Sequence, residues 1–99
     1  MAQNSATNRQ LDAPGLSLYP NPAHRTFTAE LKLIEPVTGK ATIQLINGQG
    51  STVYSIDAQV YNGKLKKQVN TSSALAPGYY LVRILMNDEV FAAKLIIQH

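Results

Sequence analysis

The sequence contains no cysteine and no tryptophan, and only 15% of its 99 residues are charged. Without cysteine the chain has no disulfide framework, no thiolate ligand for a zinc finger and no thiol nucleophile. No apolar run approaches the ~18 residues that a membrane-spanning helix needs, and Met1–Gly15 lacks the apolar middle of a secretory signal. A hydrophobic content of 44% is nevertheless typical of a folded domain, and the length suits a single one.

Several function classes lack their usual residues. The nine basic residues give a net charge of +3 but are scattered along the chain, so we expect no nucleic-acid partner. His24 and His99 stand apart from other metal ligands, and the neighbours Asp88 and Glu89 fall in an expected turn, where their side chains diverge. No serine lies in a G-x-S-x-G elbow. We therefore expect no catalysis, metal, cofactor or small-molecule substrate.

What the sequence does show is an alternation of short apolar runs with turn residues. Met1–Gly15 is polar, shows no apolar period and is interpreted as a flexible linker, whereas residues 16–99 follow a strand pattern. The prediction is an all-β fold, an antiparallel β-sandwich of about seven strands. The expected strands are Leu16–Tyr19, Arg25–Leu33, Lys40–Ile46, Ser51–Asp57, Lys64–Asn70, Tyr79–Leu85 and Val90–Ile97.

The connections add finer predictions. Asn47–Gly50 and Asn62-Gly63 supply residues that tolerate positive φ, so each should close a hairpin. Pro77-Gly78 is typical of a type II turn, and Ser72–Ala76 suits a single helical turn. Lysine on the apolar face of Lys64–Asn70 indicates an edge strand.

The five tyrosines are the main aromatic resource. We expect about half of them to fill the core, with Tyr79 and Tyr80 on opposite faces of one strand.

Three segments together resemble the type A C-terminal sorting domain of the type IX secretion system. The first is Leu18–Ala23 followed by Phe27. The second is Ala41–Leu45 through Gly50 and Val53. The third combines Val69-Asn70, Leu75, Gly78, Tyr80, Val82 and Arg83 with Lys94–Gln98. The sequence departs from the family where Asn47 replaces a frequent aspartate and Ser51 a frequent arginine.

The resemblance implies an immunoglobulin-like sandwich that routes a larger cargo protein through the periplasm to the cell surface or medium. The implied partners are the outer-membrane translocon, a surface sortase and an N-terminal cargo domain, and we expect this chain to be the tail of such a precursor. The residues that carry the family motif are Tyr19, Pro20, Asn21, Pro22, Gly50, Gly78 and Tyr80.

The expected recognition segment is the last strand, whose residues Lys94, Leu95, Ile96, Ile97 and Gln98 would be read by the translocon. Alternation places Leu95 and Ile97 in the core and leaves Ile96 exposed beside Lys94. If the strand lies at a sheet edge, its free backbone groups could be captured by strand addition.

A second interpretation uses the same residues. The run from Leu75 to Tyr80 also looks like the tyrosine corner of fibronectin-type and immunoglobulin-like modules. On that interpretation the chain is an extracellular spacer or adhesion module that binds carbohydrate or protein through exposed tyrosines.

Overall fold

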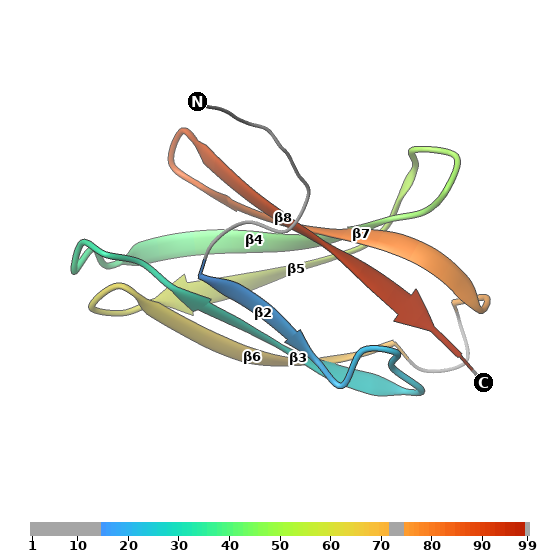
Figure 1. Cartoon of the computed structure of the whole chain (residues 1–99). Coiled ribbons are helices and arrows are strands. Elements are labelled where there is room, and N and C mark those ends of the chain that lie inside the picture. Colours follow the sequence, from blue (N-terminus) through green and yellow to red (C-terminus); the bar gives the residue numbers. More distant parts are fainter. Residues whose placement is uncertain (1–14, 72–74, 99) are drawn as a thin grey trace, which may run out of the picture.

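Seven antiparallel strands form the structure, a computed structural model that describes residues 15–71 and 75–98 (Figure 1). The strands are β2 (Leu16–Tyr19), β3 (Thr26–Lys32), β4 (Gly39–Ile46), β5 (Thr52–Val60), β6 (Lys64–Asn70), β7 (Gly78–Met86) and β8 (Glu89–Ile97). The predicted all-β class and the number of strands are confirmed. Among the described residues no helix is long and apolar enough to cross a membrane.

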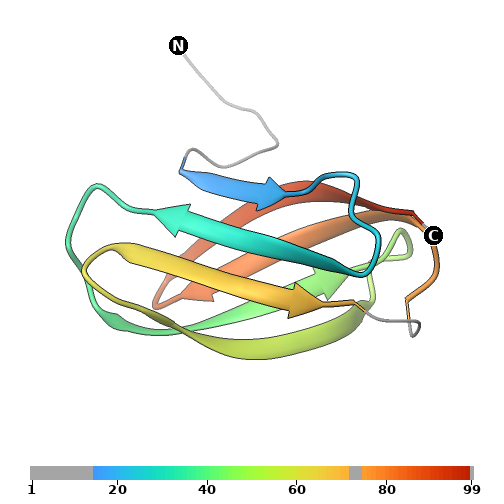
Figure 2. The same ribbon diagram turned by 90° about the horizontal axis from the view of Figure 1, so that it is seen from below.

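The strands lie in two sheets that face each other, as Figure 2 shows. One sheet has the order β2-β3-β6, and the other has the order β5-β4-β7-β8. At the two sides of the sandwich β2 lies near β8 and β5 lies near β6, so edge strands of different sheets are neighbours. β6 is an edge strand, as its sequence predicted.

The core follows from the period of two. In β3 the side chains of Phe27, Ala29 and Leu31 are buried, and in β4 those of Ala41, Ile43 and Leu45 are buried. β7 and β8 contribute in the same way, so alternate residues from both sheets meet between them. The fully buried side chains of largest volume are Phe27, Leu31, Ile43, Leu45, Ile84, Leu95, Ile97, Val60, Val69 and Val82.

Most strand ends lie within one residue of the expected ranges, but the end of β5 and the boundary of the linker need correction. β5 continues beyond Asp57 to Val60, because pairing with β4 runs on to the Gly39–Val60 register and Val60 closes the core. Gly15, assigned to the linker, accepts a hydrogen bond at its carbonyl from the Lys32 N–H at 2.8 Å. A Cβ atom on Gly15 would lie 2.3 Å from the Lys32 carbonyl oxygen, so this contact requires glycine. The remaining linker residues, 1–14, lie outside the described residues.

Both predicted hairpins are present, but the Pro77-Gly78 turn before β7 differs from its predicted geometry. Asn62 and Gly63 adopt φ of 53° and 77° between β5 and β6, as expected for an Asn-Gly turn. Gly78 has a φ of 148°, far from the roughly +80° that a type II turn requires at that position, so the type II assignment is wrong. The Ser72–Ala76 turn cannot be compared, since residues 72–74 lie outside the described residues.

Gly78 instead opens β7, where it stands opposite Ile97 of β8. Its positive φ is one that residues with a Cβ rarely adopt, although among the described residues no atom beyond its two chain neighbours lies within 4 Å of where a Cβ would be. The requirement for glycine is therefore conformational rather than steric.

We predict that Gly78→Ala lowers the free energy of unfolding by about 1–3 kcal/mol, because alanine has to adopt a sparsely populated φ. Chemical denaturation measures this loss. Gly48→Ala is the matched control: Gly48 has an equally open surrounding but no positive φ, so its substitution should change stability little. Equal stability of the two variants would show that the backbone at Gly78 relaxes without strain.

Candidate functional site

The family-motif residues gather at one end of the sandwich. Because successive strands run in opposite directions, the connections at 20–25 and 47–51 and residues 75–77 before β7 lie at the same end as residue 98. We call this the motif end; it is on the right in Figure 1. It contains the proline turn, Gly50, Gly78 and the last residues of β8. The loops at 33–38, 61–63 and 87–88 lie at the opposite end.

At the motif end, the turn after β2 hydrogen-bonds to the outer edge of β8. The Asn21 side chain donates from Nδ2 to the Lys94 carbonyl at 2.9 Å and accepts at Oδ1 from the Ile96 N–H at 3.0 Å. Ala23 continues the pattern: its N–H donates to the Ile96 carbonyl, and its carbonyl accepts from the Gln98 N–H, both at 2.7 Å. We call these four hydrogen bonds the edge clasp. The side-chain amide of Asn21 and the backbone of Ala23 thus make the hydrogen bonds that a neighbouring strand would otherwise make.

The edge clasp joins the two segments that sequence reasoning had treated separately. Asn21 belongs to the proline motif near the start of the domain, and its partners lie 73 and 75 positions later. Ala23 forms a parallel bridge with Ile97 and is fully buried. Both prolyl bonds of the turn, Tyr19-Pro20 and Asn21-Pro22, are cis. The contact was missed from the sequence because nothing local to either segment indicates its distant partner.

The five residues of the expected recognition segment differ in exposure. Leu95 and Ile97 are buried in the core, as alternation predicted, while Lys94 and Gln98 are exposed. Ile96 is half-buried rather than exposed, so that expectation is wrong. Since the Ile96 backbone groups point outward to the clasp, Ile96 and Tyr79 form a non-hydrogen-bonded pair, the arrangement that brings cross-strand side chains closest.

The idea of free backbone groups on the last strand also needs correction. β8 is an edge strand, yet the outward backbone groups at its terminal half are bonded to Asn21 and Ala23. Strand addition there would have to displace the edge clasp first.

Other motif residues have structural roles at the same end. The Tyr19 hydroxyl donates to Glu30 Oε1 at 2.8 Å, and this hydrogen bond to the carboxylate raises the pKa of Tyr19 above its ordinary value. Gly50, with a φ of 86°, closes the β4–β5 hairpin. In that hairpin Asn47 Oδ1 accepts from the N–H groups of Gln49 and Ser51, each at 3.0 Å. Both contacts use only an acceptor oxygen, so the aspartate that is frequent in the family could make them too.

Tyr80 connects the start of β7 to the segment that precedes this strand. Its hydroxyl donates to the Ala76 carbonyl at 2.5 Å, the contact of a tyrosine corner. Tyr80 is buried and Tyr54 is half-buried, whereas Tyr19, Tyr61 and Tyr79 are exposed. Tyr80 belongs to the core and Tyr54 packs against it, so two of the five tyrosines contribute to the core, as expected. Tyr79 and Tyr80 do lie on opposite faces.

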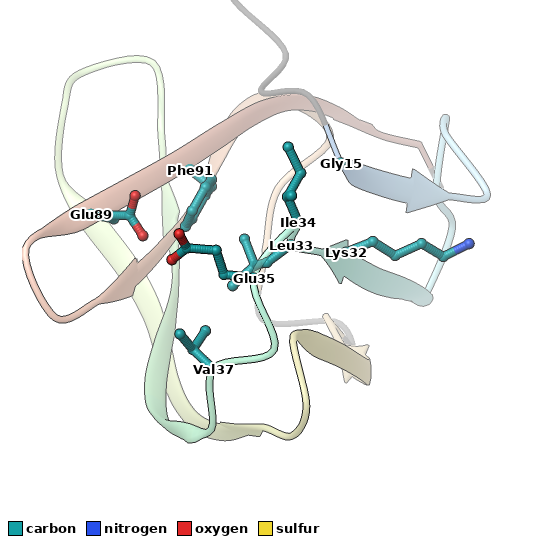
Figure 3. Close-up of a pocket in the computed structure, with 8 residues that line it drawn as sticks. All are labelled: Gly15, Lys32, Leu33, Ile34, Glu35, Val37, Glu89 and Phe91. Carbon is teal, nitrogen blue, oxygen red and sulfur yellow. The ribbon is translucent and has the colours of Figure 1, made fainter.

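A pocket of about 640 Å³ opens at the opposite end, shown in Figure 3. Its lining is apolar with acidic side chains at the rim: Gly15, Lys32, Leu33, Ile34, Glu35, Val37, Glu89 and Phe91. The Lys32 ammonium points away from the pocket. The lining contains no histidine, serine, threonine or tyrosine, so the described residues offer no hydroxyl nucleophile and no imidazole base there. None of the motif residues reaches it.

Ligand and catalytic candidates from the sequence remain apart. Within residues 15–71 and 75–98, no three His, Asp or Glu side chains are grouped as metal ligands. Glu89 begins β8, opposite Met86, and Asp88 lies in the turn before it. His24 is exposed in the turn before β3, and His99 lies outside the described residues.

Comparison with protein families gives one match that covers most of the chain. A family model described as the secretion system C-terminal sorting domain matches residues 17–98. This range includes both partners of the edge clasp. No curated protein matches the chain.

We predict that Asn21→Ala removes the protection of the Ile96 amide against hydrogen exchange and lowers the free energy of unfolding by about 1 kcal/mol. Asn21→Asp should keep the Ile96 amide protected, since a carboxylate still accepts from it. Gln98→Ala is the control, because it leaves the backbone bond from Gln98 to Ala23 in place. Unchanged Ile96 exchange in Asn21→Ala would show that the side chain does not hold the strand edge.

Proposed function

Because the chain belongs to the secretion system C-terminal sorting domain family, we propose that it directs a larger cargo protein through the outer-membrane translocon of the type IX system. Membership makes the domain a C-terminal sorting signal of that system, and the family is not an enzyme family. The implied route leads through the outer membrane to the surface or medium as part of a larger protein. The cargo, the translocon contact and processing by a surface sortase are parts of the proposal.

The observation that carries the proposal is the edge clasp. It attaches the family's proline motif to the last strand and so fixes the position of Lys94–Gln98. A segment that a receptor recognises binds more tightly when it is held rigid, since less conformational freedom is lost on binding. In this proposal the proline motif and the terminal strand act together, because the motif holds the strand in one register.

In this proposal the translocon recognises the end of β8 through its side chains. Lys94, Ile96 and Gln98 lie outside the core, whereas Leu95 and Ile97 anchor the strand beneath them. The outward backbone groups of this half of β8 are already bonded, which disfavours capture by simple strand addition. In this proposal Lys94 and Ile96 contact the translocon, and Leu95 and Ile97 keep them in place.

The spacer or adhesion module remains the alternative, favoured by the tyrosine corner between Tyr80 and Ala76. That contact stabilises many sandwiches regardless of what they do, so it indicates a fold more than a function. Export of a reporter distinguishes the two candidates.

We predict that Lys94→Ala combined with Ile96→Ser blocks export of a reporter that carries this chain in a type IX-competent cell. The reporter should accumulate in the periplasm while the melting temperature stays near the original value, because neither residue is in the core. Cell fractionation and thermal unfolding measure the two quantities.

The matched control is Lys66→Ala combined with Gln68→Ser, which alters two exposed positions of β6 on the other sheet. Deletion of Leu95–His99 is less informative, because it removes buried Leu95 and Ile97 and should unfold the domain. Normal export of the folded Lys94/Ile96 variant would contradict the proposed reading and favour the spacer interpretation.

A second prediction concerns processing. From Leu16 to Ile97 most of the described backbone is bonded within strands, and a protease needs an accessible extended segment. We expect the sortase to cut upstream of Leu16. Mass spectrometry of the released cargo should find its new C-terminus before that residue; an intact junction, or a cut within Phe27–Ile97, would refute the assignment.

A further inference from the structure

The outer faces of the two sheets differ sharply in composition. On the three-stranded sheet, β3 and β6 together point eight side chains away from the core, and none of them is apolar. These residues are Thr26, Thr28, Glu30, Lys32, Lys64, Lys66, Gln68 and Asn70. This is the ordinary face of an antiparallel sheet in water.

On the four-stranded sheet, β7 and β8 also point eight side chains outward, and six of these are apolar. The apolar residues are Tyr79, Leu81, Leu85, Val90, Ala92 and Ile96, and the other two are the cations Arg83 and Lys94. Tyr79 is 68% exposed and Val90 is 56% exposed, so apolar surface is open to solvent at both ends of the hairpin. We call these eight residues the hairpin face.

Two of the four cross-strand pairs on the hairpin face join apolar residues, one pair at each end of the hairpin. Tyr79 stands opposite Ile96, and Leu85 stands opposite Val90. Half-buried Ile46 of β4 extends the surface next to Leu81. Apolar side chains that gather on the outer face of a sheet, with few charges among them, are typical of an interaction surface.

The charges on the hairpin face indicate what covers it. The eight positions hold two cations and no carboxylate. Arg83 donates to Gln44 Oε1 from Nη2 at 2.9 Å and from Nε at 3.3 Å, and this neutral acceptor orients the guanidinium without neutralising it. An occupant that places a carboxylate over Arg83 would complement the face.

Two other occupants fit less well. A second copy of the chain would bring a face with the same sign of charge, and facing cations oppose such self-association. An anionic membrane is attracted by clusters of about 4–8 basic residues, whereas this face has Arg83 and Lys94 alone among its outward positions.

We propose that the hairpin face of β7–β8 is the docking surface for a protein of the export machinery, one that presents an apolar surface with a carboxylate positioned for Arg83. The inference rests on the proposed function and extends it from the end of β8 to the whole hairpin, because Lys94 and Ile96 are themselves members of the face. A sheet face of this kind takes a flat partner, with the aromatic ring of Tyr79 and the side chain of Val90 as its most accessible contacts.

The test is the combined variant Tyr79→Thr and Val90→Thr in the full chain fused to an exported reporter. Threonine suits an exposed strand position, so the fold should persist. Loss of two accessible apolar contacts should reduce the exported fraction about tenfold or more, with the melting temperature nearly unchanged. The control, Lys66→Thr with Gln68→Thr on the polar sheet, should be exported normally.

A reporter without residues 15–99 separates the two levels of the proposal. If that deletion leaves export intact, the proposed function fails. If the deletion blocks export and the folded Tyr79/Val90 variant is exported normally, the docking inference alone is overturned. Sedimentation tests for a dimer, and phosphatidylserine vesicles test for membrane binding. A dimer or vesicle binding that the Tyr79/Val90 substitutions abolish would overturn the inference of a protein partner. A monomer that does not bind the vesicles agrees with that inference.

Discussion

Hydrogen bonds of the edge clasp satisfy the outward backbone groups in the terminal half of β8. A strand at the edge of a sheet exposes donors and acceptors that attract foreign strands, and small sandwiches have to manage this hazard. Here Asn21 and Ala23 satisfy the edge from outside, although they follow β2 of the other sheet. The clasp thereby links the two layers through directed hydrogen bonds in addition to side-chain packing. The clasp bonds the same strand whose pairing with β7 places Leu95 and Ile97 in the core and Lys94 outside it.

Much of the fold could be predicted from the sequence because the information is local. A period of two separates Phe27, Ala29 and Leu31 from the polar residues between them, and turn residues such as Asn62 mark the connections. The candidate site was harder to predict. Its central contact joins positions 73 and 75 apart, and no local pattern carries that pairing. Half-burial of Ile96 was missed for the same reason, since it depends on Tyr79 in the neighbouring strand.

The two outer faces show that a sandwich can present different chemistry on each side. The face of β3 and β6 is polar throughout, so its strands alternate as sheets in water usually do. β7 and β8 carry apolar residues on both faces. Alternation placed Leu95 and Ile97 of β8 in the core correctly but gave no account of the apolar residues that point outward. Apolar residues that the core does not need are informative about binding, and Leu81 and Leu85 are such residues.

The edge clasp also sets an order of events during synthesis. Ribosomes make Asn21 long before they make Ile96, and the two cannot meet until nearly the whole domain has been assembled. Every nascent chain that ends before β8 lacks one of the two strands that pair with β7 and leaves Asn21 and Ala23 without their hydrogen-bond partners. Contacts between positions so distant also slow folding, because most of the chain has to be ordered before they form. A chain that ends before β8 would therefore contain the proline motif but lack the strand to which that motif hydrogen-bonds.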